Sequence, residues 1–183
     1  STCLVTGVTT NSPGGANQNF YNFTWDCAGQ SSNLDVSWSG NTIGGNVTVI
    51  NTGGSSQLRL TSSSDYSNPI TINGDVIVSG GVLTVTGSST AMTYDINVNG
   101  DINVTAGSFA LSRGSGGEVT WTLTGDLSIS DAELRTSNTS SKFVFTVDDD
   151  THDVSLTGVS YTGTINYDID SSTVINVLDG ADP

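Results

Sequence analysis

Basic side chains are scarce in this sequence, which has four Lys and Arg residues against 18 Asp and Glu in 183 residues. Proteins that bind nucleic acid or an anionic membrane surface carry clustered Lys and Arg. The four basic residues, Arg59, Arg113, Arg135 and Lys142, are scattered along the chain. We therefore expect no nucleic-acid partner. The net charge of −14 favours either solubility alone or affinity for cations such as calcium.

Helix-forming residues and long apolar runs are also lacking. Glu occurs only at Glu118 and Glu133, and Lys and Ala are sparse, whereas Gly, Ser, Thr, Asn and Asp are abundant. This balance disfavours helices and favours short strands joined by turns. No apolar run approaches the ~20 residues that a membrane-spanning helix needs, so we expect no membrane insertion.

Cysteine is limited to two residues, Cys3 and Cys27, both near the N-terminus. We expect them to form a disulfide, which would stabilise the fold by roughly 3–4 kcal/mol and would place the protein in an oxidising compartment. The alternative is a pair of free buried thiols.

What the sequence does contain is a repeat. Apolar residues alternate with polar ones on both sides of three Gly-Asp pairs, at Gly74-Asp75, Gly100-Asp101 and Gly125-Asp126. A period of two indicates strands with one buried face. Asn46 takes the place of Asp in an earlier copy and Asp153 occupies the turn of a later, degenerate one. Successive turns are thus 29, 26, 25 and 27 residues apart.

Three short strands per copy of ~26 residues indicate an all-β parallel solenoid, since a propeller blade needs four strands and more residues. Each strand would pair with its copy in the next coil, and equivalent apolar residues would stack into ladders that form the core. The predicted ladders are Val47, Val76, Ile102, Leu127 and Val154; Val49, Val78, Val104, Ile129 and Leu156; Leu58, Leu83, Phe109 and Leu134; and Ile72, Val98 and Leu123.

The two ends of the chain differ from the repeats. Residues 1–40 hold both cysteines and an aromatic cluster, and we interpret them as an N-terminal cap over the open end of the solenoid. The alternative is an aromatic platform in which Trp25 and Trp38 stack on sugar rings. Residues 41–183 form the repeats. Because Ser172–Gly180 resembles one more strand with no cap after it, we expect a fragment of a longer solenoid or an edge used in assembly.

The acidic residues suggest two cation sites. Asp75, Asp101, Asp126 and Asp153 should stack along one edge, where each carboxylate either accepts a backbone N–H or binds a cation. The cluster Asp148, Asp149 and Asp150, with Asp153, is either a solvated loop or a weak calcium site, and it lacks an EF-hand pattern. We expect no other cofactor.

The copies GDVIVSGGVLTV, GDINVTAGSFAL and GDLSISDAEL resemble the repeats of large secreted surface proteins of Bacteroidetes. This resemblance covers about Gly44–Ile169. It implies a right-handed parallel β-helix, export by the type IX secretion route and a place at the cell surface. It supplies no catalytic residues, and the C-terminal sorting domain of such proteins is absent from this sequence.

The leading functional hypothesis is a secreted, non-catalytic β-helix that acts as a structural, adhesive or filament-forming module, with itself or surface glycans as partner. The first alternative is a carbohydrate-binding module that uses its loops and the region of Trp25 and Trp38. The second is an enzyme similar to polysaccharide lyases. It is disfavoured because Lys142 and His152, the only Lys and His, are not paired with an Arg in the sequence.

Overall fold

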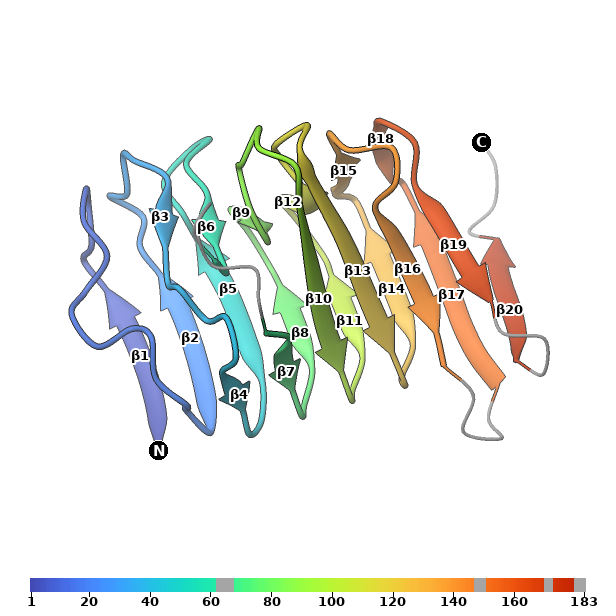
Figure 1. Cartoon of the computed structure of the whole chain (residues 1–183), viewed down its shortest axis with the longest axis horizontal. Helices are drawn as coiled ribbons and strands as arrows, with labels where there is room; N and C mark the ends of the chain where they lie inside the picture. Colours follow the sequence, from blue (N-terminus) through green and yellow to red (C-terminus); the bar gives the residue numbers. More distant parts are fainter. Residues whose placement is uncertain (62–67, 147–150, 170–172, 180–183) are drawn as a thin grey trace.

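The computed structural model describes residues 1–61, 68–146, 151–169 and 173–179 as strands joined by turns. The strands lie side by side along the long axis, with the N-terminal coils at one end and the C-terminal coils at the other (Figure 1). Within these ranges there is no helix with the length and apolarity that a membrane span requires.

The strands form three sheets. In spatial order, sheet 1 contains β1 (Thr2–Thr6), β2 (Asn22–Asp26), β5 (Val47–Asn51), β8 (Val76–Val78), β11 (Ile102–Val104), β14 (Leu127–Ser130), β17 (Thr151–Thr157) and β20 (Val174–Asp179). Sheet 2 contains β3 (Leu34–Asp35), β6 (Leu58–Arg59), β9 (Val82–Thr84), β12 (Ser108–Ser112), β15 (Glu133–Thr136) and β18 (Ser160–Thr162). Sheet 3 contains β4 (Thr42–Ile43), β7 (Ile70–Ile72), β10 (Met92–Val98), β13 (Gly117–Leu123), β16 (Lys142–Phe145) and β19 (Asn166–Ile169).

The predicted β-solenoid with three strands per coil is confirmed. The chain passes from sheet 1 to sheet 2 to sheet 3 and returns to sheet 1 one coil further along, and sheets 2 and 3 each hold six strands. Neighbouring strands within each sheet are parallel, for example β8 beside β11 and β11 beside β14. Each coil supplies the long crossover that parallel pairing needs, and in the described residues no helix is part of it.

The predicted core ladders are also confirmed. Val76 lies beside Ile102, and Ile102 beside Leu127, in consecutive strands of sheet 1. Leu83, Phe109 and Leu134 align in the same way in sheet 2. The ladder residues from Val47 to Leu134 are almost fully excluded from solvent. Alternate residues point into the coil, so stacking of the coils supplies the hydrophobic core that no single repeat could form.

Residues 1–40 continue the same sheets. They supply β1, β2 and β3, and both β2 and β3 pair in parallel with the coil that follows. Residues 7–21 cross the N-terminal end of the solenoid, where Ala16 is buried and Phe20 packs against the core. Ala16 also accepts a hydrogen bond from Nε1 of Trp38 at 2.7 Å, which fixes this crossing segment to the core.

The predicted disulfide is wrong, because both cysteines are free. Cys3 lies beside Phe23 in the register of β1 and β2, four residues before Cys27. Four strand residues span roughly 13 Å, whereas the Cα atoms of a disulfide lie within ~7 Å of each other. The Cys27 thiol is buried and donates to the carbonyl oxygen of Val5 at 3.6 Å, and its burial raises the pKa of the thiol.

Candidate functional site

The Gly-Asp turns stack into a column of side chains that we call the Asx ladder: Asn22, Asn46, Asp75, Asp101, Asp126 and Asp153. From Asn22 to Asp126, each Oδ1 atom accepts the backbone N–H of the ladder residue in the next coil. The N–H of Asp101 donates to Asp75 at 3.0 Å, and that of Asp126 donates to Asp101 at 2.8 Å. The same bond joins Asn22 to Asn46, Asn46 to Asp75 and Asp126 to Asp153. The sequence predicted the stack and an N–H acceptor, but the acceptor serves the neighbouring coil.

Glycine precedes Asp in these turns because the ladder leaves no room for a side chain. A Cβ atom on Gly100 would collide with Oδ1 of Asp75 and with the backbone of Gly74, at 2.7 Å from its carbonyl carbon. A Cβ on Gly125 would collide in the same way with Asp101. The two residues of the Gly-Asp pair therefore act together. Gly leaves room for the carboxylate of the preceding coil, and Asp provides the carboxylate that accepts the hydrogen bond from the next coil.

The ladder's hydrogen bonds account for the repeated Asp without a cation. In the part of the chain that the structure describes, no group of three or more His, Cys, Asp or Glu side chains is arranged to hold a metal ion. Asp153 accepts Nδ2 of Asn176 at 3.1 Å, so a polar contact continues into β20. The other three members of the predicted calcium cluster, Asp148, Asp149 and Asp150, lie outside the described residues.

The last full rung of the ladder departs from the pattern, because His152 stands where earlier copies have Gly. Its ring is buried, and Nδ1 lies 2.9 Å from the carbonyl oxygen of Gly125. Nε2 lies 3.1 Å from the carbonyl oxygen of Thr146. The lone histidine thus joins two coils through their backbone. This is a structural arrangement, and no acidic or nucleophilic side chain contacts the ring among the hydrogen bonds of the described residues.

The proposed aromatic sugar platform is wrong, because Trp25 and Trp38 are both 0% exposed. Nε1 of Trp25 donates to Gln30 at 2.9 Å. The Trp38 ring packs edge-on against Phe23, with ring centroids 4.7 Å apart. Both indoles therefore belong to the core, and neither presents a face on which a sugar could stack.

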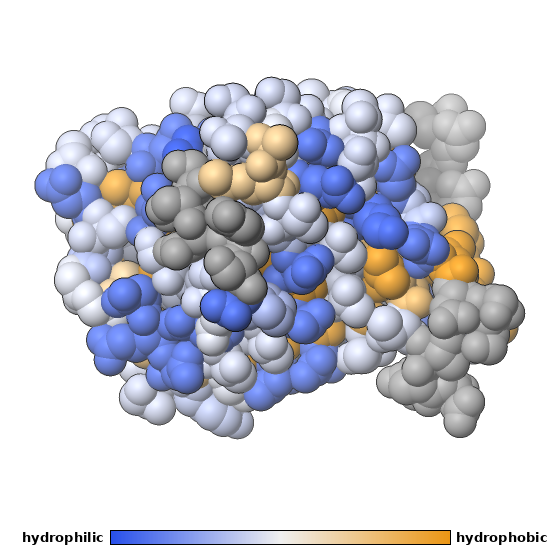
Figure 2. Space-filling view, in the orientation of Figure 1, coloured by the Kyte–Doolittle hydropathy of each residue, from blue (hydrophilic) through white to orange (hydrophobic). Residues whose placement is uncertain are grey.

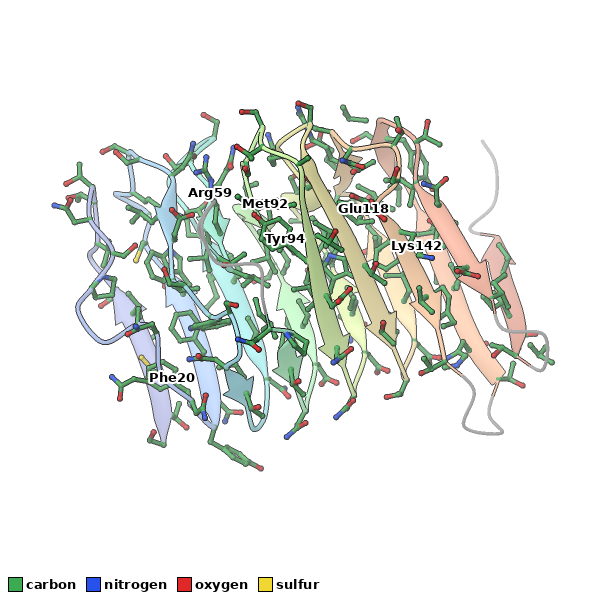
Figure 3. All side chains as sticks on the ribbon, in the orientation of Figure 1. Phe20, Arg59, Met92, Tyr94, Glu118 and Lys142 are labelled. Atoms are coloured by element: carbon green, nitrogen blue, oxygen red, sulfur yellow. The ribbon has the colours of Figure 1, made fainter. Side chains whose placement is uncertain are left out.

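A polar cleft of about 300 Å³ lies at the N-terminal half of sheet 2. Asp35 on β3 and Arg59 on β6 are neighbours in the register, and the segment from Thr86 to Thr90 forms the opposite wall. Figure 3 labels Arg59, which lies on β6. Gly87 permits this packing, since a Cβ there would lie only 2.6 Å from Nη2 of Arg59.

The two charged groups of the cleft are near each other without a close hydrogen bond. Nη1 of Arg59 is 3.9 Å from Oδ1 of Asp35, and both side chains are partly exposed. Within the described residues, Oδ1 of Asp35 is a buried atom with no hydrogen-bond partner. Burial raises the pKa of the Asp35 carboxyl, and the positive charge of Arg59 offsets this only in part.

A second charged group lies further along the outer face of sheet 2. Glu133 accepts hydrogen bonds from Ser108 at 2.7 Å and from Thr162 at 2.8 Å, so it links three consecutive strands. Arg113 and Arg135 approach the same carboxylate at 3.5 and 3.6 Å. Burial by itself would raise the pKa of Glu133, but the two hydroxyl donors and the two arginines outweigh it and hold the pKa below its usual 4.5.

This gathering of charge on sheet 2 was not predicted from the sequence. Arg59 and Arg135 each follow a leucine of the same core ladder, so they occupy the same outward position of the repeat. That shared position was visible in the sequence as Leu58-Arg59 and Leu134-Arg135. Arg59 and Arg135 therefore lie on one sheet, with Arg113 directly after β12 of that sheet, although the three are far apart along the chain.

The C-terminal end presents apolar side chains at core positions. Val177 stands beside Val154 in the register, yet Val177 is 71% exposed and Val154 is 4% exposed. Tyr161, Tyr167 and Ile169 occupy the corresponding core positions of sheets 2 and 3 and are also exposed. Figure 2 shows hydrophobic residues gathered at this end of the molecule. We call these four residues the end face.

The geometry thus singles out the Asx ladder, the cleft at Asp35 and Arg59, and the end face. The side chains of the ladder form hydrogen bonds between coils. The cleft, in contrast, has partly exposed charged groups, and the end face has exposed apolar side chains. Comparisons with protein-family models, curated proteins and solved structures found no match to this chain.

Proposed function

We propose that the protein is a non-catalytic structural module of the cell surface that stacks end to end on another β-solenoid coil, in the manner of a filament subunit. The observation that carries this proposal is the end face, where core-facing side chains such as Val177 lie open to solvent. Contiguous exposed apolar surface of this kind marks sites of protein association.

The natural occupant of the end face is another coil of the same kind. Each internal coil buries its ladder residues against the next coil, and the end face repeats those positions. It thus continues an interface between coils that each of sheets 2 and 3 already uses five times among its six strands. The outer edge of β20 also has no strand paired to it among the described residues, and an open parallel edge accepts a further strand.

A second copy offers a complementary end. Its β1 is the opposite edge of the same parallel sheet, so β1 of one copy could follow β20 of another without any change of strand direction. Beside β1 is a hollow of about 430 Å³ whose lining includes Val5, Val8 and Phe20. A head-to-tail contact of this type does not close on itself and so builds filaments.

The cell-surface setting is part of the same proposal. It is supported by the resemblance of the Gly-Asp repeats to those of secreted surface proteins, and by the acidic composition, which suits an exposed module. The free cysteines give it no support, since the disulfide that would have indicated an oxidising compartment is not formed.

Sedimentation velocity over a range of concentrations, with electron microscopy of the same samples, tests the stacking. Salt near 0.15 M should be present, because copies with a net charge of −14 repel each other and such salt limits the repulsion to ~8 Å. We expect concentration-dependent rods for the unaltered chain. Val177→Lys should prevent them, because the charge would be buried at the junction.

Val174→Lys is the matched control. It changes the same residue type in the same strand, and Val174 is 57% exposed, but it is next to the outward-facing Thr151 and not over the core. Rods should survive this change. A chain that stays monomeric at all concentrations, or an equal effect of both variants, would contradict the proposal.

A further inference from the structure

The cleft between Asp35, Arg59 and the segment Thr86–Thr90 has unused hydrogen-bonding capacity of two kinds. Oδ1 of Asp35 is an acceptor with no donor among the described residues. Arg59 uses Nε to bind Oε1 of Gln57 at 3.1 Å, while its terminal nitrogens form no hydrogen bond with the rest of the described chain. The side chain of Asp35 is 34% exposed although its Oδ1 atom is buried, so its carboxylate and the guanidinium of Arg59 line the same small volume.

The distance between the guanidinium and the carboxylate determines which kind of ligand group can bind both. At 3.9 Å, Nη1 of Arg59 and Oδ1 of Asp35 are too far apart for a direct hydrogen bond. A ligand group that meets both side chains must accept from the guanidinium and donate to Oδ2 of the carboxylate, because Oδ1 is buried. A hydroxyl does both, whereas a carboxylate or phosphate ligand would accept from Arg59 but would be repelled by Asp35.

The opposite wall is rigid and rich in hydroxyl groups. The N–H of Ser88 donates to Oγ1 of Thr86 at 3.1 Å, and the N–H of Thr90 donates to Oγ of Ser88 at 3.1 Å. These bonds fix the segment in place before any ligand arrives, which lowers the cost of ordering on binding. Ser89 and Thr90 are exposed at the rim. The cleft volume of about 300 Å³ lies at the lower end of the ~300–1,000 Å³ range of small-molecule sites.

We propose that this cleft binds a saccharide unit through its hydroxyl groups, with Arg59 donating to one hydroxyl and Asp35 accepting from an adjacent one. A neutral sugar suits the site, because its hydroxyls match both charged groups and it meets no repulsion from a chain of net charge −14. The site lies on the side of the coil. It is therefore independent of the end face, and stacking could fail while this proposal held.

The full 183-residue chain, labelled with a fluorophore, is first applied to an array of neutral and acidic glycans. The best neutral oligosaccharide is then titrated by calorimetry into the unaltered chain and into Asp35→Asn and Arg59→Gln. We expect each substitution to weaken binding at least about tenfold, as for the loss of one hydrogen bond to a charged group. Lys142→Gln is the matched control, since it removes a positive charge from sheet 3, where Lys142 pairs with Asp168.

Circular dichroism and thermal melting check that each variant is folded. If Arg59→Gln does not fold, Arg59→Lys replaces it, because lysine keeps the charge but not the planar set of donors. Binding of a neutral glycan that both cleft variants lose and the control keeps supports the site. The proposal is overturned if no neutral glycan binds, if only acidic glycans bind, or if the cleft variants bind as well as the unaltered chain.

Discussion

Oδ1 of Asp101 accepts the backbone N–H of Asp126 at 2.8 Å, so the side chain of one coil completes the backbone of the next. The same bond recurs between the other members of the Asx ladder, and it ties together turns that are 24 to 29 residues apart in sequence. A repeat spacing that is uneven in the chain thus becomes an even spacing in the structure.

The first prediction concerns this bond. Asp101→Ala should lower the free energy of unfolding by about 1–3 kcal/mol, because the N–H of Asp126 loses its acceptor. Asp101→Asn should stay within about 1 kcal/mol of the unaltered chain, since Asn46 performs the same role for Asp75 at 3.0 Å. Urea unfolding followed by circular dichroism measures both values. Equal losses of stability in the two variants would show that the hydrogen bond from the backbone N–H does not account for the effect.

A second prediction tests the space beside the ladder. Gly100→Ala should destabilise the protein by about 2 kcal/mol or more, because its Cβ would overlap the Asp75 carboxylate and nearby backbone, forcing two coils apart. Gly14→Ala is the control, since a Cβ on Gly14 meets nothing within 4 Å and its backbone is not in the left-handed region. The midpoints of thermal unfolding should separate the two variants clearly.

The third prediction is a pH dependence that arises from Glu133. Its folded pKa lies below the usual 4.5, so the unfolded chain binds the proton more readily in acid. Its contribution to stability is therefore present above pH 4.5 and is lost as the pH falls through the folded pKa. The difference in unfolding free energy between the unaltered chain and Glu133→Gln should be about 1–3 kcal/mol at pH 7 and should shrink below pH 4.5.

Ser108→Ala provides an independent check on the same carboxylate. It removes the hydroxyl that donates to Glu133 at 2.7 Å, one of the interactions that lower the pKa. In this variant, the pH range over which stability is lost should move up toward 4.5, the usual pKa of the Glu side chain. A Glu133→Gln difference that stays constant from pH 7 to pH 3 would mean that the network carries no net stabilisation.

The fourth prediction follows from the free cysteines. Native alkylation should label Cys3 faster than Cys27, because Cys27 is buried and its pKa is raised by burial. In urea without a reducing agent both should react, giving two adducts in the intact mass. A reducing agent should leave the melting temperature unchanged, whereas a fall in its presence would restore the disulfide hypothesis.

The solenoid could be predicted because the same pattern of apolar and polar residues occurs in several copies. Alternation around each Gly-Asp pair fixed which residues face inward, and copies such as Val76, Ile102 and Leu127 aligned without any knowledge of distance. The copies could be compared with one another, so a strand assigned wrongly in one copy would not have aligned with the apolar residues of the others.

The features that occur once could not be predicted so well. The pairing of Cys3 with Cys27 was inferred from their number, but the register of β1 and β2, which separates them, depends on the path of residues 7–21. In the same way, nothing local distinguishes a buried Trp25 from an exposed one. The charged cleft was missed because Asp35 and Arg59 meet only when two coils are stacked.

The Asx ladder also has a direction. From Asn22 to Asp126, each side chain accepts a hydrogen bond from the backbone N–H of the next ladder residue along the chain. A segment that emerges N-terminus first, from the ribosome or from an export channel, would find its acceptor already in place on the segment before it. We therefore expect the coils to form in order from the N-terminus, with every finished turn serving as the template for the next.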